Sequence, residues 1–407
     1  MRRLSKRSRE IYFIDDTIET IRCNEVHDYA MHVQMNQADP STMGETVSRF
    51  QSLDQSIDSL IAAAIERAKL IINPRFNFAQ TRALGQNRIT DLSLKTLSLA
   101  ELTEITRSIH HDCKKSLPQF RLNSSEFFFE EYEVDMVNCF GVENHATSTR
   151  VVFDYVLTSP NGKHEMMGLK KRRYLKDMHF LAQLEADAAA LRDIENAVLP
   201  PTGVFPVILA DEAMDSLFTF FTGQLDAHAL FNQYSVYEKG KPAILDPLEP
   251  MTLISDPTIE GLMHSYAFDD LGYPTKPVAL IEENRVKNFC INGQYADLLK
   301  MESTSSFTNV VVRPGKTSYR DFISDGVIEV LKFSTFQPNG ISGAFSGEIR
   351  LGYLHRNGKK IPIKGGSVSG QTQTAFARAH YAVELTERAA YRGPQGVFFE
   401  ALTIAGS

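Results

Sequence analysis

A break near the middle of the chain limits the folds that are open to this sequence. The run Pro200-Pro201-Thr202-Gly203 joins two prolines, which lack a backbone donor, to a glycine, which adopts conformations closed to other residues. Neither a helix nor a central strand continues through such a run. Amphipathic helices alternate with strands before it, and short strands with turns dominate after it. We therefore place the main domain boundary at residues 200 and 201.

Three amphipathic helices are predicted before the break. The second begins at Ser98, which can form a capping box with Glu101, and the third covers residues 175–197. The first covers residues 53–72 and carries an apolar stripe that we expect to face a sheet or another helix: Leu53, Ile57, Leu60, Ile61, Ala64, Ile65, Ala68 and Ile72.

Strands are predicted around these helices. Residues 10–52 are rich in β-branched and aromatic side chains and predict short antiparallel strands. Residues 125–141 and 147–175 predict two hairpins, the second turning at Ser159-Pro160-Asn161-Gly162. The basic run Lys170 to Arg173 in that hairpin is interpreted as a solvated face.

The C-terminal half reads as a mainly antiparallel sheet domain with a few helices. Short apolar or alternating segments follow one another from Val204 to the end, and one hairpin turns at Asn357-Gly358. The fold class is therefore α+β. We divide the chain into an N-terminal strand-and-helix domain (1–97), a central helix-hairpin-hairpin-helix region (98–200) and a C-terminal mainly β domain (201–407).

Composition excludes several classes of protein. The chain has 43 Lys and Arg against 50 Asp and Glu, a formal charge of −7, which disfavours a general nucleic-acid binder. The four cysteines are scattered without a Cys-x-x-Cys pair, which favours a reducing compartment. We find neither a signal-type apolar stretch nor a membrane span, so we expect a cytoplasmic protein.

The residues alone reveal no catalytic centre. His110, His111 and Cys113 lie on the second helix, but adjacent histidines there diverge by about 100°, which favours one core and one surface position. Gly315-Lys316-Thr317 lacks the glycine cradle of a phosphate loop. The chain also lacks the patterns of serine hydrolases, dinucleotide-binding enzymes and helical zinc proteases.

An ordered set of segments nevertheless resembles the TldD/PmbA family, historically labelled modulators of DNA gyrase. These segments are FPVIL, SLFTFFTGQL, SDPTIEGLMHSYAFDDLGYPT, IEENRVKNF, FTNVVVRPG and the terminal LTIAG. The resemblance covers almost all of residues 201–407, is fainter over residues 98–200 and is weak before them. It implies a heterodimer of a TldD-type and a TldE-type subunit that together form a peptidase for small or unfolded peptides.

In this family the TldD-type subunit binds zinc through an H-E-x-x-x-H helix and a later cysteine, and the TldE type lacks these ligands. Aligned with that helix, the two histidine positions are Phe218 and Gly223, and the glutamate position is Thr219. The segment Tyr391 to Gly396 lies where the cysteine would come, yet no cysteine follows Cys290. The resemblance therefore implies a TldE-type subunit without catalytic residues, metal or other cofactor, and with zinc in its partner.

Asp269, Asp270 and Gly272 match the family's acidic loop. Because both subunit types share this loop, turn formation and subunit contact are the leading interpretations, and peptide binding is the alternative. Leu271 stands where a glutamate is often found.

Our leading hypothesis is a non-catalytic subunit that pairs with a TldD-like zinc protease and encloses a peptide as an added strand. Processing of a peptide-antibiotic precursor is a narrower variant, and homodimers remain open when the partner is absent. One rival is an autonomous peptidase whose metal site combines His228, His264 and Asp269. A second rival binds DNA or gyrase through the clusters Arg2 to Arg9 and Lys170 to Arg173.

Overall fold

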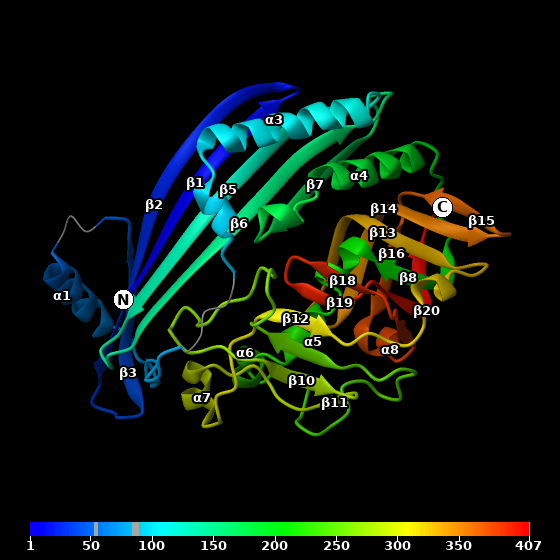
Figure 1. Cartoon of the computed structure of the whole chain (residues 1–407). Coiled ribbons are helices and arrows are strands. Elements are labelled where there is room, and N and C mark those ends of the chain that lie inside the picture. The colour runs from blue at the N-terminus through cyan, green and yellow to red at the C-terminus, as the bar shows by residue number, and fades with distance from the viewer. Residues whose placement is uncertain (53–55, 84–88, 407) are drawn as a thin grey trace.

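The computed structural model describes residues 1–52, 56–83 and 89–406 as three β-sheets with helices packed against them (Figure 1). The N-terminal sheet has seven strands in the order β4-β3-β2-β1-β5-β6-β7. Its strands are β1 (Arg2–Ile14), β2 (Thr17–Asn36), β3 (Thr42–Phe50), β4 (Asn73–Pro74), β5 (Arg121–Val137), β6 (Glu143–Thr158) and β7 (Glu165–Arg172).

The N-terminal sheet is built from strands longer than the sequence pattern predicts. β1 lies between β2 and β5 and pairs antiparallel with both along its whole length. The predicted hairpin at residues 125–141 is wrong, because most of this segment is the single strand β5, which pairs with β6. The second hairpin is confirmed, with β6 and β7 joined through the predicted turn. Strands on both sides of residues 97 and 98 thus share one sheet.

Two long helices cover one face of this sheet. They are α3 (Leu99–Ser116) and α4 (Phe180–Glu195), and the short helices α2 (Leu92–Thr96) and η1 (Leu175–Asp177) precede them. The predicted capping box is present, since Ser98 and Glu101 bond each other's backbone amides. Leu102, Leu184 and Leu191 are fully buried against Phe127 and other rings of the sheet. The predicted second and third helices are therefore confirmed.

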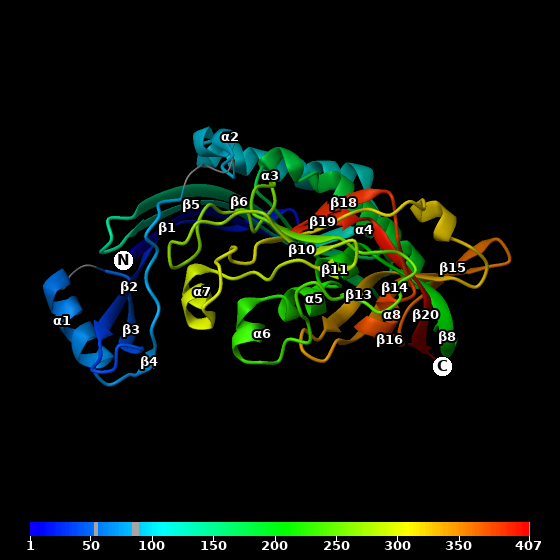
Figure 2. The same ribbon diagram turned by 90° about the horizontal axis from the view of Figure 1, so that it is seen from below.

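The first predicted helix exists, but its expected buried face is wrong. α1 (Ile57–Ala68) lies beside β3 at the end of the sheet away from α4 (Figure 2). Only Ala64 and Ala68 are buried in it, whereas 48% of Ile57 is exposed, and Leu53 lies outside the described residues. A Cβ on Gly44 of β3 would lie 2.2 Å from the Ala68 carbonyl oxygen. The helix therefore approaches the sheet backbone through its smallest side chains, which keeps its larger ones outside.

The C-terminal half contains two further sheets. The first is a six-stranded sheet in the order β11-β10-β9-β12-β19-β18. In the second sheet five strands form a closed ring in the order β13-β8-β20-β16-β14, because β13 also pairs with β14. Most pairs are antiparallel; β12–β19 and β13–β8 are parallel. The strands are β8 (Gly203–Ala210), β9 (Leu253–Asp256), β10 (Val278–Glu282), β11 (Arg285–Val286), β12 (Asn309–Val312), β13 (Ile328–Pro338), β14 (Ala344–Arg356), β15 (Lys359–Ile363), β16 (Ser367–Gln371), β17 (Ala379–Tyr381), β18 (Leu385–Arg388), β19 (Tyr391–Pro394) and β20 (Gly396–Ala405).

Short helices complete this half, and one hydrophobic core runs between its two sheets. The helices are η2 (Asp211–Asp215), α5 (Thr219–Gln224), α6 (Ala227–Phe231), α7 (Gly293–Leu299), η3 (Tyr319–Phe322) and α8 (Thr372–Phe376). The α+β fold class is confirmed. No helix among the described residues has the length and apolar character needed to cross a membrane.

Candidate functional site

The helix that would carry zinc ligands is α5, and its three key positions offer no metal donor. Phe218 immediately precedes the first helical residue and is 2% exposed. The Thr219 hydroxyl donates a hydrogen bond to the Ser216 carbonyl at 2.6 Å. Gly223 lies against the backbone of Gly340, where a Cβ would come within 3.2 Å of the carbonyl oxygen. All three positions are thus used by local packing.

The structure brings α5 together with the segment where a cysteine ligand would be expected. The Phe218 ring stacks on the Tyr391 ring, with centroids 5.8 Å apart and planes at 13°. Phe376 meets Phe218 edge to face at 5.7 Å, and Phe221 packs on Phe376 at 5.0 Å. The Tyr391 hydroxyl donates to the Pro394 carbonyl at 3.1 Å. Aromatic rings therefore occupy the space between the two segments.

These residues do not fit a zinc ion. A catalytic zinc needs three nitrogen, sulfur or carboxylate ligands and a general base for its water. Phe218 and Gly223 have no donor atom, and the Thr219 hydroxyl is already bonded. The Tyr391 hydroxyl stays protonated, because burial raises its pKa well above its ordinary value.

The predicted acidic loop is held by its own hydrogen bonds. One carboxylate oxygen of Asp269 accepts from the amides of Leu271 and Tyr273 at 3.0 Å, and the other accepts from the Ser306 hydroxyl at 2.5 Å and from the Asn292 amide at 3.4 Å. Burial raises the pKa of Asp269, while these four bonds act in the opposite direction. This geometry supports the turn-forming interpretation of Asp269.

The same loop joins the C-terminal half to the N-terminal sheet. Gly272 has a φ of +87°, a conformation that favours glycine, and its carbonyl accepts a hydrogen bond from the buried Asn144 amide at 3.1 Å. Asp270 is mostly exposed and lies 3.3 Å from the Arg2 guanidinium on β1. Between loop and sheet is a cavity of about 430 Å³, which Arg2, Asp269 and Asp270 help to line.

The rival metal site is not assembled. The His228 ring hydrogen-bonds the Tyr234 hydroxyl at 2.8 Å, and the Asp269 carboxylate is held within its loop. Over residues 1–52, 56–83 and 89–406, one group of three or more metal-ligating side chains converges within 4.8 Å, and it contains neither His228, His264 nor Asp269.

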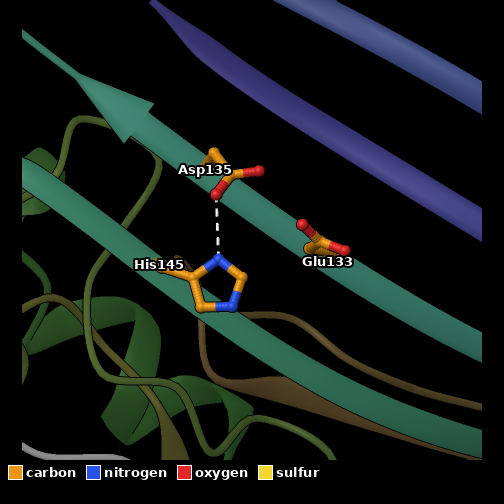
Figure 3. A group of neighbouring side chains, drawn as sticks. All are labelled: Glu133, Asp135 and His145. Carbon is orange, nitrogen blue, oxygen red and sulfur yellow. Dashed lines mark hydrogen bonds and ion pairs between the residues drawn. The ribbon is translucent and has the colours of Figure 1, made fainter.

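The group that does converge is Glu133, Asp135 and His145, which no local sequence motif indicates (Figure 3). Asp135 and His145 are opposite each other on β5 and β6, and their side chains bond at 2.8 Å. The register between the two strands brings His145 to the carboxylates, and spacing along the sequence does not reveal this. The two-residue spacing of Glu133 and Asp135 does place both carboxylates on one face of β5. The Arg3 guanidinium lies within 3.0 Å of both carboxylates, so one cation already offsets part of their charge.

The basic clusters are also engaged. On β1, Arg3 pairs with Glu133 and Asp135, Lys6 with Glu130, Arg7 with Glu25, and Arg9 with Glu131. In the second cluster Arg173 is buried, and its guanidinium donates to the carbonyls of Thr149 and Met263. The solvated-face interpretation of Lys170 to Arg173 is therefore wrong, because this part of the hairpin packs against the C-terminal half.

Comparison with known families shows a match over residues 202–406 to the PmbA/TldA metallopeptidase C-terminal domain. Two proteins of Methanocaldococcus jannaschii are similar in sequence. One is uncharacterized, at 27% identity over 54% of this chain and 53% of its own length. The other is named a metalloprotease, at 28% identity over 37% of this chain and 36% of its own length. The chain thus aligns with about half of the first and about a third of the second.

Solved structures share the fold over nearly the whole chain. TldE from Thermococcus kodakarensis superposes with a TM-score of 0.81 at 18% identity, covering 100% of this chain and 96% of that one. A Thermotoga maritima protein named as a modulator of a DNA gyrase gives 0.82 at 16% identity, covering 99% and 95%. At such identities the likeness concerns the fold.

Proposed function

This chain belongs to the TldD/PmbA metallopeptidase family, and from that premise we propose that it is the non-catalytic, TldE-type subunit of a two-subunit zinc peptidase. The observation that carries the proposal is the stack of Phe218 on Tyr391, which fills the place where α5 and the 391–396 segment would otherwise supply metal ligands. The zinc and the general base would then come from a TldD-type partner of the same family. The substrates would be small or unfolded peptides, including precursors of peptide antibiotics.

The main test is co-expression with a TldD-like protein that carries H-E-x-x-x-H. We expect the two chains to co-purify, to bind one zinc per pair and to cleave fluorogenic peptides. Replacing the partner's glutamate in that motif should abolish cleavage, whereas this chain alone should neither cleave peptides nor retain zinc. Failure to co-purify, combined with full activity of the partner alone, would overturn the proposal.

The rival functions predict different results. An autonomous peptidase would bind zinc stoichiometrically when purified alone and would lose it on replacement of His228 or His264. A DNA-binding protein would show an affinity that falls steeply with salt. The ion pairs along β1 and the burial of Arg173 argue against DNA binding. Cleavage of a peptide-antibiotic precursor by the co-purified pair tests the narrower role.

A further inference from the structure

A second cavity, of about 330 Å³, lies against the outer edge of β7. Six consecutive residues of this strand, 167–172, line it. Because successive side chains of a strand point to opposite faces, a cavity that contacts all six lies against the backbone edge. β7 is the last strand of the N-terminal sheet, so within the described chain β6 is its one strand neighbour. Helix α4, η2, β13 and the end of β18 form the other walls.

Two carboxylates of the cavity are committed to Lys332. Its ammonium lies 3.0 Å from Asp187 and 3.5 Å from Glu212. Asp187 also accepts hydrogen bonds from Tyr155 and Gln183, and Glu212 accepts from the Phe333 amide at 3.0 Å. Among the described residues Lys332 is the ion-pair partner of both carboxylates, and the Asp187 charge also acts on Lys170.

The other two carboxylates are committed to Arg388. Its guanidinium bonds both oxygens of Asp215, at 2.9 and 3.0 Å, and also bonds Asp211. Glu387, beside the cavity, lies 3.4 Å from Arg392. The cavity wall therefore contains five cations and four carboxylates. All four carboxylates pair with either Lys332 or Arg388.

Lys170 and Arg172 are the cations left on the face of β7 toward α4. In the described part of the chain neither forms an ion pair, and the Arg172 guanidinium bonds the carbonyls of Lys171 and Glu387. Burial and the neighbouring Arg172 charge lower the pKa of Lys170 to about 8, although Asp187 acts against this. Burial and Arg388 likewise lower the pKa of Arg172, while Asp177, Asp215 and Glu387 act in the opposite direction. Two half-buried like charges beside each other favour binding of an anion.

We propose that β7 accepts an extended peptide as an added strand in this cavity, with a carboxylate of the peptide bound between Lys170 and Arg172. The opposite face of β7 exposes 69% of Met167 and 58% of Leu169, which suits apolar side chains at the alternate peptide positions. The volume lies within the range of about 300–1,000 Å³ typical of ligand sites. The backbone edge supplies affinity and the two cations supply selectivity for acidic peptides.

This site rests on the proposed function for its ligand, a peptide, but binding is measured on this chain alone, so its failure is distinguishable from failure of the partner assay. The probe is a labelled, C-terminally amidated heptapeptide of alternating Leu and Glu, and its counterpart has Gln in place of Glu. We expect the Glu peptide to bind at least about tenfold more tightly than the Gln peptide. The double variant Lys170→Gln/Arg172→Gln should lose this preference, whereas Lys163→Gln, an exposed control in the same hairpin, should keep it. Equal binding by the double variant and the wild type would overturn the proposal.

A second measurement holds even if the double variant folds poorly. Hydrogen exchange of the wild-type chain with and without the Glu peptide should show slower exchange of the 165–172 amides. Slower exchange at another edge strand, such as β15 or β18, with none at β7, would contradict strand addition. A Gln peptide with a free C-terminal carboxylate distinguishes the two carboxylates that could bind the cations. If it binds tightly and this binding depends on Lys170 and Arg172, the bound group is the C-terminal carboxylate of the peptide. If it binds weakly, the bound group is a Glu side chain.

Discussion

His110 shows how a single buried side chain makes stability depend on pH. The ring is 5% exposed, stacks on Phe13 with centroids 4.0 Å apart, and bonds the Ser125 hydroxyl at 2.7 Å. Burial lowers its pKa to about 4, while Asp16 acts against this. The folded state therefore keeps His110 neutral, and the unfolded state takes up a proton below its ordinary pKa of about 6.5.

We predict that His110 contributes stability that is fully present above about pH 6.5 and is lost as the pH falls toward 4, by up to about 3 kcal/mol. The variant His110→Gln should lack this part of the pH dependence. Urea unfolding at several pH values measures it. His111→Gln, an exposed neighbour on α3, should keep the wild-type dependence. An unchanged acid dependence in His110→Gln would show that other groups cause it.

At the level of elements, the capping box of α3 is a local contribution that can be isolated. The Ser98 hydroxyl accepts from the Glu101 amide at 3.2 Å, and the Glu101 carboxylate accepts from the Ser98 amide at 2.7 Å. We predict that Ser98→Ala lowers the free energy of unfolding by about 1 kcal/mol. Chemical denaturation measures this, with Ser108→Ala in the exposed middle of α3 as the control. A loss of the same size in the control would contradict a specific role of the cap.

The same elements show how far the sequence could predict the fold. Periodicity and capping signals located α3 and α4, because large apolar side chains such as Leu102 and Leu191 mark the buried face. The same signals predicted the wrong buried face for α1, because Ala68 approaches Gly44 so closely that the smallest side chains, rather than the largest, face the sheet. The pairing of β1 with β5 was beyond local reasoning, since it joins residues more than 100 positions apart.

The candidate site was predictable to a similar extent. Family resemblance located Phe218 and the Tyr391 segment separately, but their ring stacking depends on the tertiary fold. The sequence does not show that Lys170 lacks an ion-pair partner among the described residues. Only the structure shows which carboxylates are already paired with other cations. Composition and spacing cannot contain that information.

For the whole molecule, Arg173 links the two halves. Its guanidinium donates to the Thr149 carbonyl on β6 at 3.2 Å and to the Met263 carbonyl in the C-terminal half. Burial and the nearby Arg150 charge lower its pKa to about 10, so it remains charged at neutral pH. A planar guanidinium can donate hydrogen bonds to both carbonyls at once. The ammonium of a shorter lysine side chain cannot keep both hydrogen bonds in the same geometry.

We predict that Arg173→Lys lowers stability by about 1–3 kcal/mol and loosens the contact between the halves. Hydrogen exchange should then accelerate at residues 262–264 and 149–150 together. Arg7→Lys, at an exposed pair with Glu25 on β1, is the control and should change neither quantity measurably. Exchange that accelerates in one half alone would contradict a linking role.

The ring stack at Phe218 also bears on how this chain could change over evolutionary time. A histidine introduced there alone would bury an imidazole among Tyr391 and Phe376 without a ligand to hold. Gly223 cannot gain a side chain unless the Gly340 loop shifts. Each first step toward metal binding at this position therefore costs stability before it gains chemistry. Any new activity is easier to acquire elsewhere on the molecule.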